Sequence, residues 1–266
     1  MNKKDEMDTE IITISYTKLS ISFVLVLIPG LISAFLRLGL LKSILWGGTR
    51  TFVQLTLIGY VLNFIFAQNN IIILVILLTL MCYIASQASV KRVTIKFKEA
   101  ELLSFISLWL STFFVGTIVV GIIISPSPIY SPKVVIPIFG MLLGNSMNAI
   151  SLSLDRFFHE VHTKYDEVET LLSFGASKWE AVLEPIKQGL RSGMTPTINS
   201  LMVVGIVSLP GMMTGQILGG VSPIEAVKYQ IVVMLMITAS VAIGSLIFIG
   251  FSFKKVFNPD GTLNID

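Results

Sequence analysis

Charged residues are scarce in this sequence, and cysteine and histidine are scarcer still. Asp, Glu, Lys and Arg make up 13% of the 266 residues, against about 25% in a typical soluble domain, while hydrophobic residues make up 53%. The single cysteine, Cys82, excludes an intrachain disulfide and a thiolate metal cluster built from one chain. The small net charge of +3, spread along the borders of apolar runs, argues against nucleic-acid binding. The composition predicts a polytopic membrane protein.

Recognisable catalytic motifs are also missing. The sequence has no G-x-x-x-x-G-K-[ST] phosphate loop, no G-x-S-x-G elbow and no H-E-x-x-H helix. Its two histidines, His159 and His162, are three residues apart and fit a solvated helix end better than a metal site. We therefore expect a chain that is not an enzyme and binds no cofactor of its own.

Long apolar runs are what the sequence has in abundance. A hydrocarbon core about 30 Å thick needs roughly 20 helical residues to cross it. Seven runs meet that length, with the third short and the sixth rich in glycine: 19–40, 44–66, 71–89, 102–124, 134–153, 195–218 and 227–252. They predict an all-α, polytopic helical bundle of about seven transmembrane helices, in a single transmembrane domain over residues 1–266.

The basic residues predict how this bundle is oriented. With seven spans, one side receives 14 lysines and arginines and the other receives five. Because cytoplasmic loops carry the excess of Lys and Arg, we expect the N-terminus outside and the C-terminus in the cytoplasm. The charged segment 155–192, between the fifth and sixth spans, then lies in the cytoplasm.

Within that segment, residues 166–191 have the pattern of an amphipathic helical element. Apolar residues recur at i, i+3, i+4 spacing on both sides of Gly175, and charged residues occupy the remaining positions. Glycine breaks the pattern, and Gly-Ala-Ser at 175–177 predicts a corner between two helices that another protein's surface can approach closely. Such an element is suited to passing force to a soluble partner.

Polar residues inside the predicted spans point to a pathway. Arg50 and Gln54 are four residues apart in the second span and share a helix face; Arg50 is as well explained by snorkelling to the membrane interface. In the fifth span, Asn145 and Asn148 follow a G-x-x-x-G pair at 140–144 that would let helices approach closely. We expect these two amides either to bond between helices or to line a polar cavity.

The sixth span contains several helix-breaking residues. Proline and glycine at membrane depth are tolerated where the backbone is buried in protein or lines water, as in transporters with broken helices. This span therefore supplies the best pointer to a pathway, with candidates Ser208, Pro210, Gly211, Met212, Met213 and Gln216. Thioethers also coordinate soft cations, although methionine is more often a core residue, so the metal candidates are Met141, Met147, Met212 and Met213.

Four segments carry a resemblance to a known family. They are ILWGGTRTFVQLTLIGYVL (44–62), VIPIFGMLLGNSMNAISL (135–152), LLSFGAS (171–177) and VGIVSLPGMMTGQILGGVSPIEAVKYQI (204–231). The chain resembles the permeases of the FetB/YbbM type, which are implicated in bacterial iron export and related to plant aluminium-tolerance permeases.

The resemblance implies a transmembrane subunit of an ABC transporter. Such a subunit would form a homodimer in the lipid bilayer of the plasma membrane, and a separate cytosolic ATPase subunit would bind the ATP and Mg²⁺. It also implies that residues of the charged segment form the coupling motif that docks on the ATPase: Glu169, Gly175, Ala176, Ser177 and Trp179. Thr170 and Pro185 depart from the importer version of this motif, so export of iron or another metal follows from the family resemblance alone.

Two other classes of function remain open. A secondary transporter driven by an ion gradient would need buried acidic residues as relays, and Asp155 and Glu169 lie outside the predicted spans. A membrane-embedded regulator would use the charged element but would not need the broken sixth span. The sequence favours the permease, and it offers no carboxylate cage for a free divalent cation, so a chelate or another solute stays possible as substrate.

Overall fold

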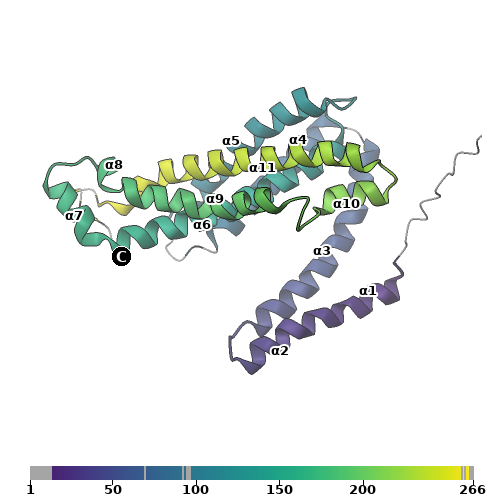
Figure 1. Ribbon diagram of the computed structural model, residues 1–266, viewed down its shortest axis with the longest axis horizontal. Helices are drawn as coiled ribbons and strands as arrows, with labels where there is room; N and C mark the ends of the chain where they lie inside the picture. The colour runs from purple at the N-terminus through teal and green to yellow at the C-terminus, as the bar shows by residue number, and fades with distance from the viewer. Residues whose placement is uncertain are drawn as a thin grey trace, which may run out of the picture. The chain divides into compact units, whose positions relative to one another are not determined.

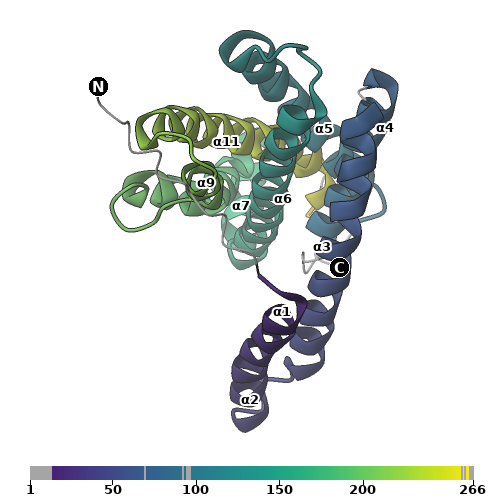
Figure 2. The same ribbon diagram turned by 90° about the vertical axis from the view of Figure 1, so that its right-hand side faces the viewer.

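The computed structural model describes residues 14–68, 70–91, 93, 97–258, 260, 262 and 263, and it divides into two compact units (Figures 1 and 2). Unit 1 comprises Met1–Asn69 with Leu218–Gly220, and unit 2 comprises Asn70–Ile217 with Val221–Asp266. Each unit is described by itself below. The single transmembrane domain over residues 1–266 stays a prediction.

Unit 1 is a hairpin of apolar helices. Its elements are α1 (Tyr16–Ser22), a 3-10 turn η1 (Phe23–Val26), α2 (Leu27–Phe35) and α3 (Leu41–Gln68). The buried hydroxyl of Ser33 accepts a hydrogen bond of 3.0 Å from the Leu40 N–H and so closes the connection between α2 and α3. Gly30 brings α2 close to α3, because a Cβ there would lie 3.2 Å from a methyl carbon of Leu41.

Unit 2 holds the remaining helices around a central helix, α6. Its elements are α4 (Ile71–Val90), α5 (Ala100–Ile118) with a π-helical end η2 (Val119–Ile124), α6 (Pro132–Thr163), α7 (Tyr165–Ser173), α8 (Lys178–Ala181), α9 (Leu183–Val203), α10 (Gly211–Leu218), α11 (Pro223–Ser252) and a 3-10 turn η3 (Phe253–Val256). Helices α4, α5, α9 and α11 all pack on α6, and α11 also packs on α5 and α9. In Figure 1, α6, α9 and α11 run side by side along the length of this unit.

Large apolar side chains and small polar ones share the interior of unit 2. Side chains with almost no exposure, such as Leu154, Phe157 and Phe248, form its centre. Serine pairs join the helices: the hydroxyls of Ser146 and Ser240 lie 2.9 Å apart between α6 and α11. Small residues of this kind let helices approach closely in a membrane, where apolar burial alone gives little preference for helix over lipid.

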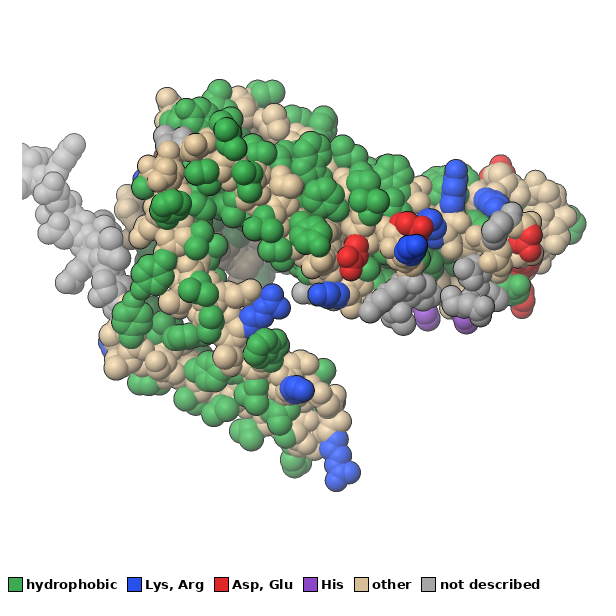
Figure 3. Space-filling view, turned by 180° about the vertical axis from the view of Figure 1, so that it is seen from behind, with side chains coloured by type: hydrophobic (Ala, Val, Ile, Leu, Met, Phe, Trp, Pro, Cys, Tyr) green, Lys and Arg blue, Asp and Glu red, His purple; other side chains and the backbone are tan. Residues whose placement is uncertain are grey.

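The expected all-α membrane fold is confirmed. Six helices of the described chain are long and apolar enough to cross a membrane, and the predicted span 195–218 is the broken pair α9 and α10. Helix α6 continues ten residues past the predicted end at 153, and α9 begins twelve residues before 195, since nothing in the adjoining amphipathic sequence ends a helix there. The face of unit 2 seen in Figure 3 carries its charged side chains toward the end with α7 and α8. The orientation of the termini stays a prediction.

Candidate functional site

The corner between α7 and α8 is built by two consecutive capping motifs. Helix α7 ends at Ser173, and Gly175, two residues later, has φ +88°, a left-handed conformation that glycine adopts without strain. The Gly175 N–H donates to the Leu172 carbonyl and the Ala176 N–H to the Leu171 carbonyl, both at 3.0 Å, which is the Schellman pattern. The predicted break at Gly175 is therefore confirmed and has a defined geometry.

Ser177 begins the next helix with a capping box. Its hydroxyl accepts from the Glu180 N–H at 3.3 Å, and the Glu180 carboxylate accepts from the Ser177 N–H at 2.8 Å and from its hydroxyl at 2.6 Å. The side-chain hydrogen bond from Ser177, followed by its backbone N–H, lowers the pKa of Glu180 below the ordinary value. Residues 175–177 thus form a turn with hydrogen-bonded caps on both sides.

The corner presents an exposed aromatic side chain that the sequence analysis did not select. Phe174, immediately before Gly175, is 87% exposed, and Leu171 and Trp179 beside it are each about two-fifths exposed. A Cβ on Gly175 would meet nothing within 4 Å, so the turn is open to an approaching surface. We call Leu171, Phe174 and Trp179 the corner patch. Phe174 lies between two small residues, Ser173 and Gly175, in a charged segment, and this pattern could have identified the corner patch from the sequence.

The coupling glutamate expected from the resemblance is engaged by a contact within the chain. Glu169 is half-buried, and its carboxylate accepts a hydrogen bond of 3.1 Å from the backbone N–H of Leu263 near the C-terminus. Ala176, Ser177 and Trp179 are at or beside the turn, as expected. Glu169 is therefore engaged within the chain, whereas Gly175 and Ser177 of the same motif are exposed.

Helix α9 leads from the corner into the membrane fold through a close contact with α6. Gly189 and Gly193 lie on the buried side of α9, and a Cβ on either would come within 2.7 Å of a backbone carbonyl oxygen of α6, that of Ser153 or Ala149. This is a G-x-x-x-G pair that the sequence analysis overlooked because it lies before the predicted start of the sixth span. By contrast, a Cβ on Gly144 of the expected pair at 140–144 would meet nothing within 4 Å.

A polar pocket of about 110 Å³ lies between α6 and α9, just beyond Gly193. Both asparagines singled out in the sequence face it from α6. Asn145 is exposed, and its amide donates to the Met141 carbonyl at 2.8 Å. The other lining residues are Asn148, Ala149, Leu152, Gly193, Pro196, Thr197 and Ser200. Amide and hydroxyl groups at this depth can bind a hydrated or chelated solute through hydrogen bonds.

Beyond the pocket the chain leaves the helical conformation between α9 and α10. Val204 is extended, Gly205 has φ +84°, and the Gly205 N–H donates to the Ser208 carbonyl at 2.9 Å to make a small turn. Helix α10 restarts at Gly211, and the Pro210 carbonyl accepts from the Thr214 N–H at 3.1 Å. The predicted interruption of the sixth span is thus a turn at 204–210.

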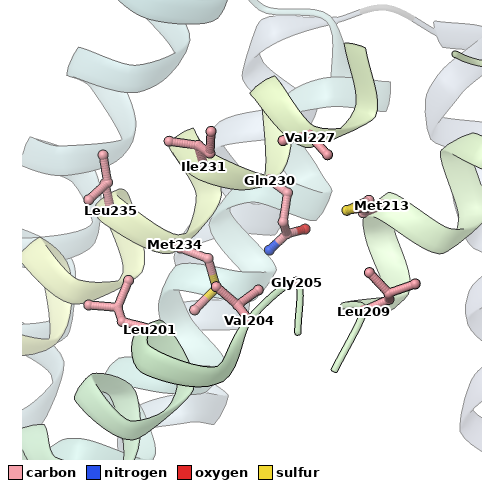
Figure 4. Close-up of a pocket in the computed structure, with 10 residues that line it drawn as sticks. All are labelled: Leu201, Val204, Gly205, Leu209, Met213, Val227, Gln230, Ile231, Met234 and Leu235. Atoms are coloured by element: carbon pink, nitrogen blue, oxygen red, sulfur yellow. The ribbon is translucent and has the colours of Figure 1, made fainter. Parts of the chain in front are cut away.

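An apolar pocket of about 270 Å³ lies where this turn faces α11 (Figure 4). Gln230 of α11 points its amide into the pocket toward the turn, and Met213 of α10 and Met234 of α11 flank it. Gln230 is 95% buried, and its Oε1 has no hydrogen-bond partner among the described residues. The sequence analysis missed Gln230 and Met234, which appear as one amide and one thioether in a uniform transmembrane run.

The other predicted residues are not brought into one cluster. Arg50 and Gln54 are exposed on α3 of unit 1. Met147 packs against the core of unit 2, and Met141 and Met212 are half-buried. Gln216 has a buried Oε1 without a partner among the described residues. The described residues also contain no group of three His, Cys, Asp or Glu side chains that could hold a metal ion.

These features define a polytopic helical membrane protein with a capped, exposed corner, a polar pocket and a broken helix. The chain belongs to the UPF0014 family, whose model, described as an uncharacterised protein family, matches residues 16–257. It is 34% identical to the probable iron export permease protein FetB of Escherichia coli, over 92% of this chain and 93% of that protein.

Two further relatives extend the family to other organisms. The chain is 33% identical to the UPF0014 membrane protein YjkA of Bacillus subtilis, over 91% of this chain and 95% of that protein. It is 32% identical to the protein ALUMINUM SENSITIVE 3 of Arabidopsis thaliana, over 85% of this chain and 81% of that protein. No solved structure matches the chain.

Proposed function

We propose that this chain is the transmembrane subunit of an ATP-driven ABC transporter that exports iron or another metal ion across the plasma membrane. A separate cytosolic subunit would bind and hydrolyse ATP with Mg²⁺, and two copies of the chain would form the pathway. The observation that carries the proposal is the corner patch, an exposed apolar surface on a rigid turn in a charged segment. The name of the Escherichia coli relative, a probable iron export permease, supports the substrate class.

The corner has the properties that a coupling contact needs. A docking surface gains most from a few exposed aromatic anchors, and Phe174 is the most exposed large side chain of the corner. Because both sides of the turn are capped, a displacement applied to Phe174 moves α7 and α8 instead of unwinding them. Helix α9 follows directly and passes along α6 to the polar pocket, so the two sites are joined by one packed element.

The gradient-driven alternative has less support. A proton or sodium relay needs acidic side chains buried within the spans. Glu160 is buried, but it lies near the end of α6 and forms an ion pair with Arg156 on the same helix. The polar pocket is lined by amides, hydroxyls and apolar groups, and none of its lining residues is acidic. This lining suits transport that is driven by ATP hydrolysis on a cytosolic subunit.

The test is capture of an ATPase by the full chain, purified from its native membrane, and by the variant Phe174→Asp. The wild-type chain should retain a soluble ATPase, and the variant should retain at least tenfold less, because a charge replaces the anchor. Glu167→Gln is the matched control, since its side chain is 61% exposed on the same helix and outside the corner patch. Failure of the wild-type chain to retain an ATPase, or equal retention by Phe174→Asp, would contradict the proposal.

Transport by the reconstituted complex tests the pathway and the substrate together. Efflux from vesicles loaded with iron should require ATP and should fall severalfold in Asn145→Leu, while capture of the ATPase stays unchanged. Repeating the assay with copper and manganese separates a preference for iron from general metal export. Unchanged efflux in Asn145→Leu would remove the polar pocket from the proposed pathway.

A further inference from the structure

The C-terminal residues of the described chain fold back onto the corner element. After α11, the chain forms the turn η3, and Phe257 then pairs with Leu263 in an antiparallel bridge. The Asn258 N–H donates to the Thr262 carbonyl at 2.8 Å, which closes this short hairpin. We call the described residues of this segment, 253–258, 260, 262 and 263, the C-terminal clasp.

One hydrogen bond ties the clasp to α7. The backbone N–H of Leu263 donates to Oε1 of Glu169 at 3.1 Å, across 94 positions of the chain. Leu263 is itself buried, and it belongs to the same apolar cluster as Val168, the residue before Glu169. The Glu169 side chain is therefore held against the body of the protein by a long-range contact.

Two ring contacts tie the clasp to α8 on the other side of the corner. The ring of Trp179 meets that of Phe253 edge to face, with centroids 5.1 Å apart and planes at 84°. The Lys178 Nζ lies 5.1 Å from the centre of the Phe257 ring, within the range of a cation–π contact. The clasp thus touches both helices that flank Gly175.

We infer that Glu169 is a positioning residue whose carboxylate accepts the Leu263 N–H and thereby lets the C-terminal clasp fix the angle of the corner. In this assignment Glu169 acts as a hydrogen-bond acceptor inside the chain, and the exposed side chain of Phe174 is the main surface left for a partner. The family resemblance alone would assign the same glutamate to direct docking on the ATPase. The two roles differ in one property, because docking uses the negative charge and the clasp needs only an acceptor oxygen.

That difference can be tested with two substitutions at one position. Glu169→Gln keeps an acceptor oxygen at the same length, and Glu169→Leu removes it while keeping most of the apolar volume. Hydrogen exchange of the full chain in lipid nanodiscs reports the Leu263 amide and the peptide covering 171–182. Glu169→Leu should raise exchange at Leu263 about tenfold and should also raise it in 171–182, since loss of one hydrogen bond is of about that size. Glu169→Gln should stay within about threefold of wild type.

A double substitution tests whether the bond itself is responsible. Leu263→Pro removes the donor N–H, and it should raise exchange in 171–182 as Glu169→Leu does. If both act through one contact, the double variant should exchange no faster than the single ones. Glu167→Leu, an exposed glutamate two positions earlier on α7, is the control and should leave both readouts unchanged.

Some outcomes would overturn the assignment. Unchanged exchange at Leu263 in Glu169→Leu would show that the bond does not hold the clasp. Equal effects of Glu169→Gln and Glu169→Leu would show that the charge matters and not the acceptor. Additive effects in the double variant would mean that Glu169 and Leu263 act on the corner separately.

The consequence for coupling rests on the proposed function and has its own readout. In a complex with the ATPase, Glu169→Gln should keep at least half of the wild-type ATP hydrolysis, and Glu169→Leu should lose most of it while still capturing the ATPase through Phe174. If hydrogen exchange behaves as expected but no ATPase is captured by the wild-type chain, the clasp stands and the proposed function fails. Loss of hydrolysis in Glu169→Gln with normal exchange would restore direct docking by the charge.

Discussion

The segment from α7 to α10 has two parts that differ in packing. The first part, up to Thr197, is capped and packed against the helical bundle, and the second part, from Ile198, is largely exposed. Up to Thr197 the chain is capped at the corner, and Ile186, Gly189, Gly193 and Thr197 are buried on the face of α9 toward the bundle. Between Ile198 and Leu209 most apolar side chains are exposed, and in the turn at 204–210 Ile206 is 89% and Val207 is 77% exposed. Both parts are similarly rich in glycine and proline, so composition does not explain the difference.

Within α9 and the turn that follows it, the difference in packing lies in what each glycine faces. Gly189 and Gly193 face the α6 backbone, so their missing side chains let two helices touch and hold each other. Gly205 and Gly211 face open space, so their missing side chains free the backbone to turn. Under the proposed function, a displacement of the corner would pass along α9, which is packed against α6, to the turn at 204–210 beyond the polar pocket.

Breaking the packed part should have the largest effect. In Gly193→Leu, the new side chain would displace Ser153 and press on the Ala149 carbonyl oxygen, which would lie 2.6 Å from the Cβ. Separating the two helices should lower the free energy of unfolding by about 3 kcal/mol, at the upper end of overpacking costs. Unfolding in mixed detergent micelles, followed by circular dichroism, measures this loss. Gly144→Leu on α6 is the control, since a Cβ there would meet open space, and an equal loss in both variants would contradict the packing argument.

The corner should show the next largest effect. Gly175→Val forces a β-branched residue into the left-handed conformation at φ +88°, which should cost about 1–2 kcal/mol locally. Exchange of the Gly-Ala-Ser amides should rise about tenfold, while the unfolding of the helical bundle stays unchanged. Gly175→Asn is the control, because asparagine tolerates this conformation and should restore most of the protection. If Gly175→Asn behaved like Gly175→Val, space and not backbone conformation would be the constraint at this turn.

The sequence predicted the elements better than it predicted their contacts. Hydrophobic length gave the membrane helices, and the Gly-Ala-Ser turn gave the corner, because both are local properties of the chain. The G-x-x-x-G pair of α9 was overlooked since it lies in a charged stretch, and only the structure reveals that its apolar face turns toward α6. The bond between Glu169 and Leu263 joins positions 94 residues apart, and no local pattern encodes such a pairing. The same holds for Gln230, whose importance depends on a cavity.

A substitution of Gln230 tests whether the pocket beside the turn at 204–210 is empty. Gln230→Leu removes a buried acceptor without a described partner and keeps a similar volume, so it should raise the free energy of unfolding of the isolated chain by about 1 kcal/mol. The same unfolding assay measures it, with Val227→Leu as a control that fills the apolar pocket without changing its polarity. A loss of stability in Gln230→Leu would mean that the Gln230 amide forms a hydrogen bond in the membrane. Its partner would then be another molecule that occupies the pocket.

The smallest effect concerns the start of α8. Ser177→Ala removes the cap of this short helix and should cost about 1 kcal/mol locally, seen as faster exchange of the Glu180 amide.

The same capping box should make α8 sensitive to pH. Because hydrogen bonds from Ser177 lower the pKa of Glu180 in the folded protein, the contribution of the Glu180 carboxylate to the stability of α8 is present above the unfolded pKa. It is lost as the pH falls through the folded pKa. Protection of α8, corrected for intrinsic exchange, should therefore be constant above about pH 5 and should decline below about pH 4. Glu180→Gln keeps the cap without a titrating group, so its protection should not change over this range. A decline in Glu180→Gln as steep as in wild type would assign the pH dependence to another carboxylate. The corner would then be stabilised by the turn at Gly175 and not by the Glu180 carboxylate.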